Sequence, residues 1–189
     1  MGKIPKLPIN LIKEMKRVVK EPKKQRALTK FLNQSNIKLE IGRQIAEAIV
    51  DRTLEGVDKN GKDFKAYKKS YIKSDDFKIY GKKSSDVNLK LTGAMLSAIE
   101  VVKLTPTGVV IWINDSKERK KASGHIYGDN PNKMPIRDFW DLPNDYELEA
   151  IFDDVVSNSI SEIEAISEVI ETSLNIGVGN QDPLLFGAL

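Results

Sequence analysis

The stretch that decides the fold begins with Leu89-Lys90-Leu91-Thr92-Gly93-Ala94-Met95-Leu96-Ser97-Ala98-Ile99 and runs to Trp140. Leu91, Met95 and Ile99 recur at helical spacing, and Thr92 and Gly93 provide a start signal. The spacing predicts a short helix over residues 91–99 that packs one apolar edge against a core.

A hairpin is predicted next. Residues 100–104 precede a breaker, Thr105-Pro106-Thr107-Gly108, and the chain continues as Val109-Val110-Ile111-Trp112-Ile113-Asn114. This second run is β-branched and aromatic, which is typical of a buried strand. After a polar segment the stretch ends on bulky apolar residues. We expect one core to contain Leu91, Met95, Ile99, Ile111, Ile113, Phe139 and Trp140.

Helices are predicted on both sides of this stretch. A stripe at Ile37, Ile41, Ile45 and Ile49 predicts a helix over residues 36–54. An acidic first turn and a sustained apolar period predict a long C-terminal helix over 144–174. Shorter helical pieces are expected over 9–19, over 27–32 and around Tyr67 and Tyr71. Asn-Gly within 56–64 indicates a tight turn or small hairpin, and 75–88 is expected to be an exposed loop.

These elements predict an α+β fold, in which helices pack a small antiparallel sheet. Its 189 residues suit a single domain with arms. We expect a basic N-terminal arm with a short helix (1–34), an α+β domain (35–174) that ends in the long C-terminal helix, and an extended C-terminal docking tail (175–189).

Composition excludes several classes of protein. Hydrophobic residues make up 40% of the chain and charged residues 30%, which is ordinary for a folded domain. No cysteine is present, so disulfides, a thiolate nucleophile and cysteine-ligated zinc are excluded. No apolar run approaches the ~18 residues of a membrane span. We therefore expect no membrane association.

The net charge of +3 conceals a strong asymmetry. Residues 1–34 hold ten Lys or Arg against two Glu, whereas 138–189 hold twelve acidic residues and no basic one. Opposite ends of this kind can pair head to tail between copies of one chain. The alternative, that both ends are simply solvated faces, is left open.

Catalytic patterns are weak. His125 is the only histidine, so a histidine metal triad or a Ser-His-Asp site with a spare base cannot be built. Asp115, Glu118 and Lys120 imitate part of a magnesium nuclease, but the same charged run is typical of a solvated helix. No glycine spacing matches a phosphate loop. We expect no catalytic residue, no metal and no cofactor.

Several segments in fixed order resemble the tailed-phage virion morphogenesis family, which includes tail-completion and neck proteins. They are Asp58-Lys59-Asn60-Gly61-Lys62-Asp63-Phe64 with tyrosines after it, Leu91-Thr92-Gly93-Ala94-Met95-Leu96-Ser97-Ala98-Ile99, Gly124-His125-Ile126-Tyr127-Gly128, and Met134-Pro135-Ile136-Arg137-Asp138-Phe139-Trp140. The resemblance covers about residues 37–170. Ala98 stands where serine is common in the family, and Trp140 replaces the usual aliphatic residue.

The resemblance implies a non-enzymatic virion protein that forms a homo-oligomeric ring at the head–tail junction, assembled in the host cytoplasm. A ring that meets the tail tube would be a hexamer, and one that follows the portal would be a dodecamer. Its partners would be adjacent neck, tail-terminator, tail-tube or portal and adaptor proteins. Of the residues that we expect at interfaces, His125 and Arg137 lie within the resemblance. The others lie in the two arms outside it, and they are Lys13, Lys16, Arg17, Leu184, Leu185 and Phe186.

Arg137 is expected to hold backbone carbonyls or a carboxylate in a forked geometry that lysine cannot copy. Gly93 and Gly128 are expected at positions of tight packing or positive φ. The alternative function is DNA binding by the basic N-terminal arm, and non-specific DNA contact is also left open for a ring protein.

Overall fold

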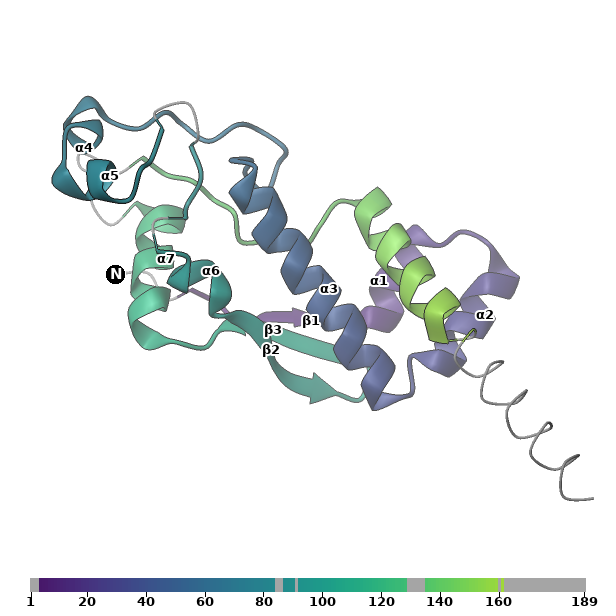
Figure 1. The fold of residues 1–189 in the computed structure, drawn as a ribbon. Coiled ribbons are helices and arrows are strands. Elements are labelled where there is room, and N and C mark those ends of the chain that lie inside the picture. The colour runs from purple at the N-terminus through teal and green to yellow at the C-terminus, as the bar shows by residue number, and fades with distance from the viewer. Residues whose placement is uncertain (1–3, 84–86, 91, 129–134, 160, 162–189) are drawn as a thin grey trace, which may run out of the picture.

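The computed structural model describes residues 4–83, 87–90, 92–128, 135–159 and 161. The labelled elements are β1 (Leu7–Ile9), α1 (Leu11–Val18), α2 (Pro22–Phe31), α3 (Ser35–Leu54), α4 (Lys69–Ile72), α5 (Asp75–Ile79), α6 (Ala94–Ser97), β2 (Ile99–Thr105), β3 (Gly108–Ile113) and α7 (Ser116–Tyr127). A further helix covers residues 145–159. The sheet and α3 form the middle of the molecule, α4–α7 lie at one end, and α1, α2 and helix 145–159 lie at the other (Figure 1).

The sheet is antiparallel, with strand order β1-β3-β2. The predicted hairpin is present, with Ile99 opposite Ile113 and Thr105 opposite Gly108. The register shifts between Val101 and Lys103. Together with the surrounding helices, this small sheet confirms the predicted α+β class.

Helix α3 lies across the sheet, as its apolar stripe requires. Ile41, Ile45 and Ile49 are completely buried. Gly42 lets the helix approach closely, because a Cβ atom there would lie 2.8 Å from Cγ2 of Val101. The predicted helix 36–54 is therefore confirmed, one residue longer at its start.

The expected core is confirmed for six of its seven residues, which are all buried in one cluster: Met95, Ile99, Ile111, Ile113, Phe139 and Trp140. Leu91 lies outside the described residues. The rings of Phe139 and Trp140 pack edge to face, with centroids 6.2 Å apart. The indole nitrogen of Trp140 donates to the Pro5 carbonyl oxygen at 3.1 Å.

The structure corrects the expectation of an N-terminal arm. Residues 7–9 form β1, which pairs with the central strand β3. The apolar side chains of this region belong to the same core as the rest of the chain: Ile4, Ile9, Leu11, Met15, Val18, Val19, Leu28 and Leu32. Helix α2 also begins at Pro22, earlier than predicted, because proline is well suited to the first helical position.

The loop predicted over residues 75–88 is only partly correct. Ser74 caps a short helix, α5, and Phe77 on this helix is buried. Its ring packs edge to face on Tyr67 and Tyr71, with centroids 5.6 and 5.4 Å away. Near residue 60 the expected small hairpin is present, with a bridge between Val57 and Asp63.

The C-terminal helix starts where the sequence predicts, and Asn144 and Glu147 form reciprocal caps at 3.0 Å. Residues 160 and 162–174 of the predicted helix, and the predicted docking tail 175–189, lie outside the described residues.

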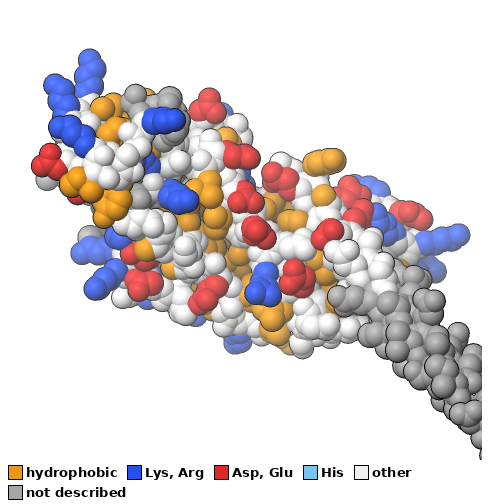
Figure 2. All heavy atoms as spheres, in the orientation of Figure 1, with side chains coloured by type: hydrophobic (Ala, Val, Ile, Leu, Met, Phe, Trp, Pro, Cys, Tyr) orange, Lys and Arg blue, Asp and Glu red, His pale blue; other side chains and the backbone are white. Residues whose placement is uncertain are grey.

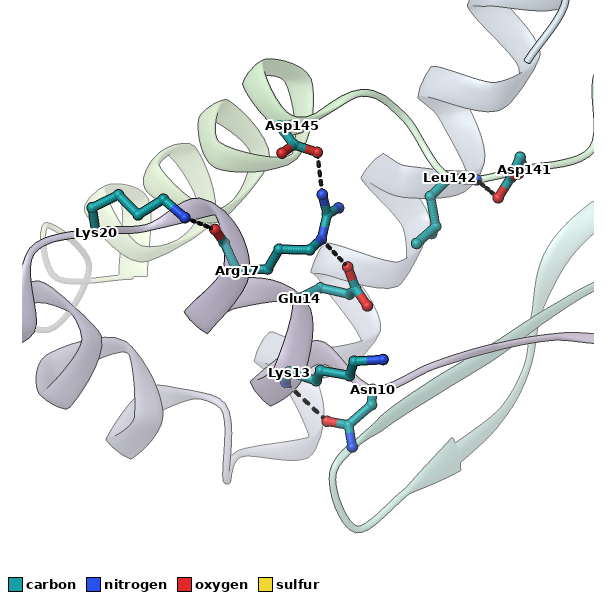
Figure 3. Close-up of polar contacts among 8 residues, drawn as sticks. All are labelled: Asn10, Lys13, Glu14, Arg17, Lys20, Asp141, Leu142 and Asp145. Atoms are coloured by element: carbon teal, nitrogen blue, oxygen red, sulfur yellow. Dashed lines mark hydrogen bonds and ion pairs between the residues drawn. The ribbon is translucent and has the colours of Figure 1, made fainter. Parts of the chain in front are cut away.

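Basic and acidic residues from the two ends of the chain meet within one molecule. Arg17 on α1 lies between Glu14 and Asp145 and pairs with both (Figure 3). Lys24 on α2 pairs with Asp153 at 2.6 Å. Part of the charge complementarity that the sequence offered for pairing between copies is thus satisfied inside one chain.

Candidate functional site: a pocket around Arg137 and His125

A pocket of about 350 Å³ lies at the α4–α7 end of the molecule. Its lining comes from the segment after the Gly61 turn, from α6 and α7, and from the segment that precedes the last helix. The lining residues are Tyr67, Lys68, Tyr71, Lys82, Asn88, Leu89, Thr92, Gly93, Met95, Glu118, Lys121, His125, Pro135 and Arg137. Two of the residues singled out in the sequence, His125 and Arg137, therefore lie in one site.

Arg137 is only 4% exposed and joins three parts of the chain. Its guanidinium donates through Nε and Nη2 to the Lys65 carbonyl oxygen at 3.2 and 2.9 Å, and Nη2 also reaches the Ala66 carbonyl oxygen at 3.5 Å. Its backbone N–H donates to the His125 carbonyl oxygen at 2.8 Å. The forked contact with backbone carbonyls predicted for Arg137 is present.

The electrostatics of Arg137 follow from this burial. Desolvation lowers the pKa of its guanidinium, and the nearby hydroxyls of Tyr67 and Tyr71 act in the opposite direction. The guanidinium carbon also lies 5.1 Å from the centroid of the Tyr67 ring, a cation–π contact. The positive charge is therefore held against an aromatic wall of the pocket.

His125 stands in the last turn of α7. Burial, and then the charge of Arg137, lower the pKa of its imidazole from 6.5 to about 4, so the ring is neutral at pH 7. Nδ1 is buried and has no hydrogen-bond partner. The helix ends three residues later at Gly128, which has a φ of +66° and donates its N–H to the Gly124 carbonyl oxygen. Gly128 therefore caps α7 in the left-handed backbone conformation, which agrees with the positive φ expected for this glycine.

Glu118 lies seven residues before His125 on α7 and is also buried. Its Oε1 accepts from Lys121 Nζ at 2.6 Å, while its Oε2 is buried without a partner. The nuclease-like reading of Asp115 and Glu118 is not supported by the geometry. Asp115 caps α7 by accepting from the N–H groups of Lys117 and Glu118, and these bonds lower the pKa of its carboxyl.

Among the described residues, no group of three or more histidine and acidic side chains is placed to hold a metal ion. The described lining of the pocket combines the cationic side chains of Lys68, Lys82, Lys121 and Arg137 with the carboxylate of Glu118, beside apolar residues that include Leu89, Met95 and Pro135. Such a site is suited to binding a ligand that is both apolar and anionic.

Tyr67 and Lys121 were not recognised as site residues from the sequence, and Glu118 was considered only as part of a nuclease-like charged run. The four-residue spacing of Tyr67 and Tyr71 was visible, but nothing local placed these rings beside α7. Tyr67 is fixed by a hydrogen bond from its hydroxyl to the Asn88 carbonyl oxygen at 2.6 Å, which joins residues 21 positions apart.

The other predicted site residues lie elsewhere. Lys13, Lys16 and Arg17 are on α1, which lies at the opposite end of the molecule from α4–α7 (Figure 1). Leu184, Leu185 and Phe186 lie outside the described residues. The structure therefore brings together His125 and Arg137 and separates them from the basic residues of α1.

Several large hydrophobic side chains are exposed on elements that surround the pocket end of the molecule. They are Ile79 (76% exposed) and Tyr80 (50%) at the end of α5, Tyr127 (45%) on α7, and Ile136 (47%) beside Arg137. Figure 2 shows hydrophobic side chains interspersed with Lys and Arg at this end. Exposed apolar residues of this size are typical of protein–protein contact surfaces.

Comparisons of this chain with protein-family models, with curated proteins and with solved structures give no match. In the part of the chain that the structure describes, no helix has both the length and the apolar character needed to cross a membrane.

Proposed function

We propose that this chain is a non-enzymatic virion protein of a tailed phage, which acts as a tail-completion or neck protein in a homo-oligomeric ring at the head–tail junction. The proposal rests mainly on where the motif segments lie in the fold. The motif segments that resemble the virion morphogenesis family are separated in sequence, but they contact one another at one end of the fold.

The Asp58 segment contacts the Arg137 segment directly. Asp58 accepts hydrogen bonds from the N–H groups of Asn60 and Lys62 at 2.8 and 3.0 Å, which shapes the turn. The next residue, Lys59, donates its N–H to the Asp138 carbonyl oxygen at 2.8 Å and pairs its ammonium with the Asp138 carboxylate at 2.9 Å. Phe64, the aromatic residue of the motif, is buried.

The two remaining segments join the same cluster. Gly93, with a φ of +87°, immediately precedes α6, and Met95 on α6 lines the pocket together with His125. The backbone bond from Arg137 to His125 connects α7 to the last segment. Motif residues that are spread over about 80 positions thus form one structural unit, which a chance set of short patterns would not require.

A ring needs two different complementary surfaces on each copy. The exposed hydrophobic residues around the pocket end offer one such surface. Its neighbours would be neck, tail-terminator, tail-tube or portal and adaptor proteins, and it would act in the virion after assembly in the host cytoplasm, without a cofactor or membrane contact.

The proposal is tested by locating the protein in purified virions. Mass spectrometry should detect it at a copy number of a ring, near six or twelve per particle, an expectation from closed cyclic symmetry. Gold-labelled antibody should mark the neck. Absence from virions, with the protein found only in the infected-cell lysate, would contradict the proposal.

DNA binding by the basic N-terminal segment is less well supported. Arg17 and Lys24, two of its cations, already pair with Asp145 and Asp153 of the same chain. Phosphate contacts would have to compete with these pairs. A gel shift with duplex DNA that weakens steeply with salt would restore this alternative.

A further inference from the structure

We infer that the pocket around Arg137 binds residues 181–189 of a second copy of this chain, Gln181-Asp182-Pro183-Leu184-Leu185-Phe186-Gly187-Ala188-Leu189. The contact would join neighbouring copies in a ring. Only the location of this ring in a virion rests on the proposed function.

The pocket is built for an apolar side chain beside an acidic one. Its volume of about 350 Å³ lies in the range of ligand pockets, about 300–1,000 Å³. Tyr67, Tyr71, Leu89 and Met95 supply apolar walls. Lys68, Lys82, Lys121 and Arg137 place positive charge around them, and Glu118 is the carboxylate among the lining residues that the structure describes. A bound apolar group would be desolvated, while a neighbouring carboxylate would meet the lysines.

The proposed occupant has this chemistry. Residues 181–189 contain one acidic residue, Asp182, and no basic one. Asp182 stands two residues before Leu184-Leu185-Phe186, the most apolar run of this segment. Pro183 between them restricts the backbone, which lowers the conformational entropy lost on binding.

A second copy is favoured over the same chain because of where helix 145–159 lies. This helix packs beside α1 and α2, at the end of the molecule distant from α4, α5 and α7 (Figure 1). A contact from that end of one copy to the pocket end of the next joins two different surfaces. Repeated contacts of this type build rings or filaments.

Nucleic acid is the competing ligand for the same lysines. It is disfavoured because single-stranded bases need open stacking platforms. Here the Tyr67 and Tyr71 rings pack on each other and on Phe77, with centroids 5.3–5.6 Å apart.

The direct test is a binding titration with a fluorescently labelled peptide of residues 181–189. The protein is the full chain carrying Phe186→Ser, so that its own segment competes weakly. Saturable binding is expected, and replacing Phe186 by Ser in the peptide should weaken it about tenfold or more, as for a buried aromatic anchor. Adding Lys68→Glu to the protein should weaken binding about two- to fivefold.

Lys23→Glu is the matched control, because it makes the same charge change at an exposed position of α2, at the opposite end of the molecule from the pocket, and should leave peptide binding unchanged. With the natural full chain, sedimentation velocity should show concentration-dependent association that excess peptide reverses. This readout uses purified protein, so it can succeed even if the protein is absent from virions, and virion localisation can succeed even if the peptide does not bind.

Three results would overturn the inference. The first is no peptide binding. The second is a monomer at all concentrations whose pocket tyrosine NMR signals shift on Phe186→Ser, since the segment would then occupy its own pocket. The third is a labelled oligonucleotide that binds with the same dependence on Lys68 while the peptide does not bind.

Discussion

Replacing Arg137 by lysine tests the structural centre of the motif cluster. The change keeps the positive charge but removes the fork that spans the Lys65 and Ala66 carbonyl oxygens and the planar contact with the Tyr67 ring. A hydrogen bond to a charged group contributes about 1.5–3 kcal/mol, and lysine can replace only part of the set. We therefore expect Arg137→Lys to lower the free energy of unfolding by about 2–4 kcal/mol.

The assay is urea denaturation of both proteins, followed by far-UV circular dichroism, with a thermal melt alongside. For a chain of this size each kcal/mol corresponds to about 2–4 °C in Tm, so a drop of about 4–16 °C is expected. Arg43→Lys is the control, because the Arg43 side chain is 70% exposed and should change stability by less than about 0.5 kcal/mol. If Arg137→Lys matches this control, Arg137 does not hold the segments together.

Three further predictions concern the core, the helix end and pH. Phe139→Ala should cost about 3–5 kcal/mol in a denaturant titration, because the ring is completely buried, and an unchanged melting temperature would refute this core. Gly128→Ala should destabilise the protein more than Gly61→Ala in the same assay. Both glycines have positive φ, but a Cβ atom at Gly128 would lie 2.9 Å from Ile136, whereas a Cβ atom at Gly61 would have no atom within 4 Å. Equal effects of the two substitutions would count against this packing. The pKa of His125 is lowered to about 4 in the folded protein, so the unfolded chain takes up a proton first as the pH falls. The free energy of unfolding should therefore drop by about 3 kcal/mol between pH 6.5 and pH 4. His125→Gln should remove this part of the pH dependence, and parallel stability curves for the two proteins would show that His125 does not cause it.

Much of the fold could be predicted from local sequence patterns. The stripe on α3 and the β-branched run of β3 each repeat one residue class at one period, so their structure could be predicted without knowing their neighbours. Gly93 and Gly128 were predictable for a similar reason, since each stands at the boundary of a short helix. Arg137 was predictable as a fork-shaped donor, although its acceptors were not.

Features that depend on distant partners escaped the sequence. Strand β1 has only three residues, one of them Pro8, and exists because it pairs with β3. Phe77 is buried and packs against the rings of Tyr67 and Tyr71, which come from a different segment of the chain. Arg52 shows the same limit: it donates to the carbonyl oxygens of Phe139, Asp141 and Leu142 at 2.9–3.0 Å and ties α3 to the segment before the last helix. Nothing in the local sequence of α3 indicates those acceptors.

The charge pattern gave a correct observation and an incomplete interpretation. From the sequence, the basic start and acidic end could either pair between copies or be solvated faces, and two of their pairs form within one chain. Sequence asymmetry alone cannot distinguish contacts within a chain from contacts between chains. Of the acidic residues after position 161, Asp182 lies in the segment, residues 181–189, that we propose to bind a neighbouring copy.

The most direct test of the proposed function is electron microscopy of particles from a phage that lacks this gene. The proposal predicts DNA-filled heads and separate, otherwise complete tails, with joined particles restored when the gene is supplied from a plasmid. Normal infectious virions, or a block in DNA replication before heads are filled, would contradict it.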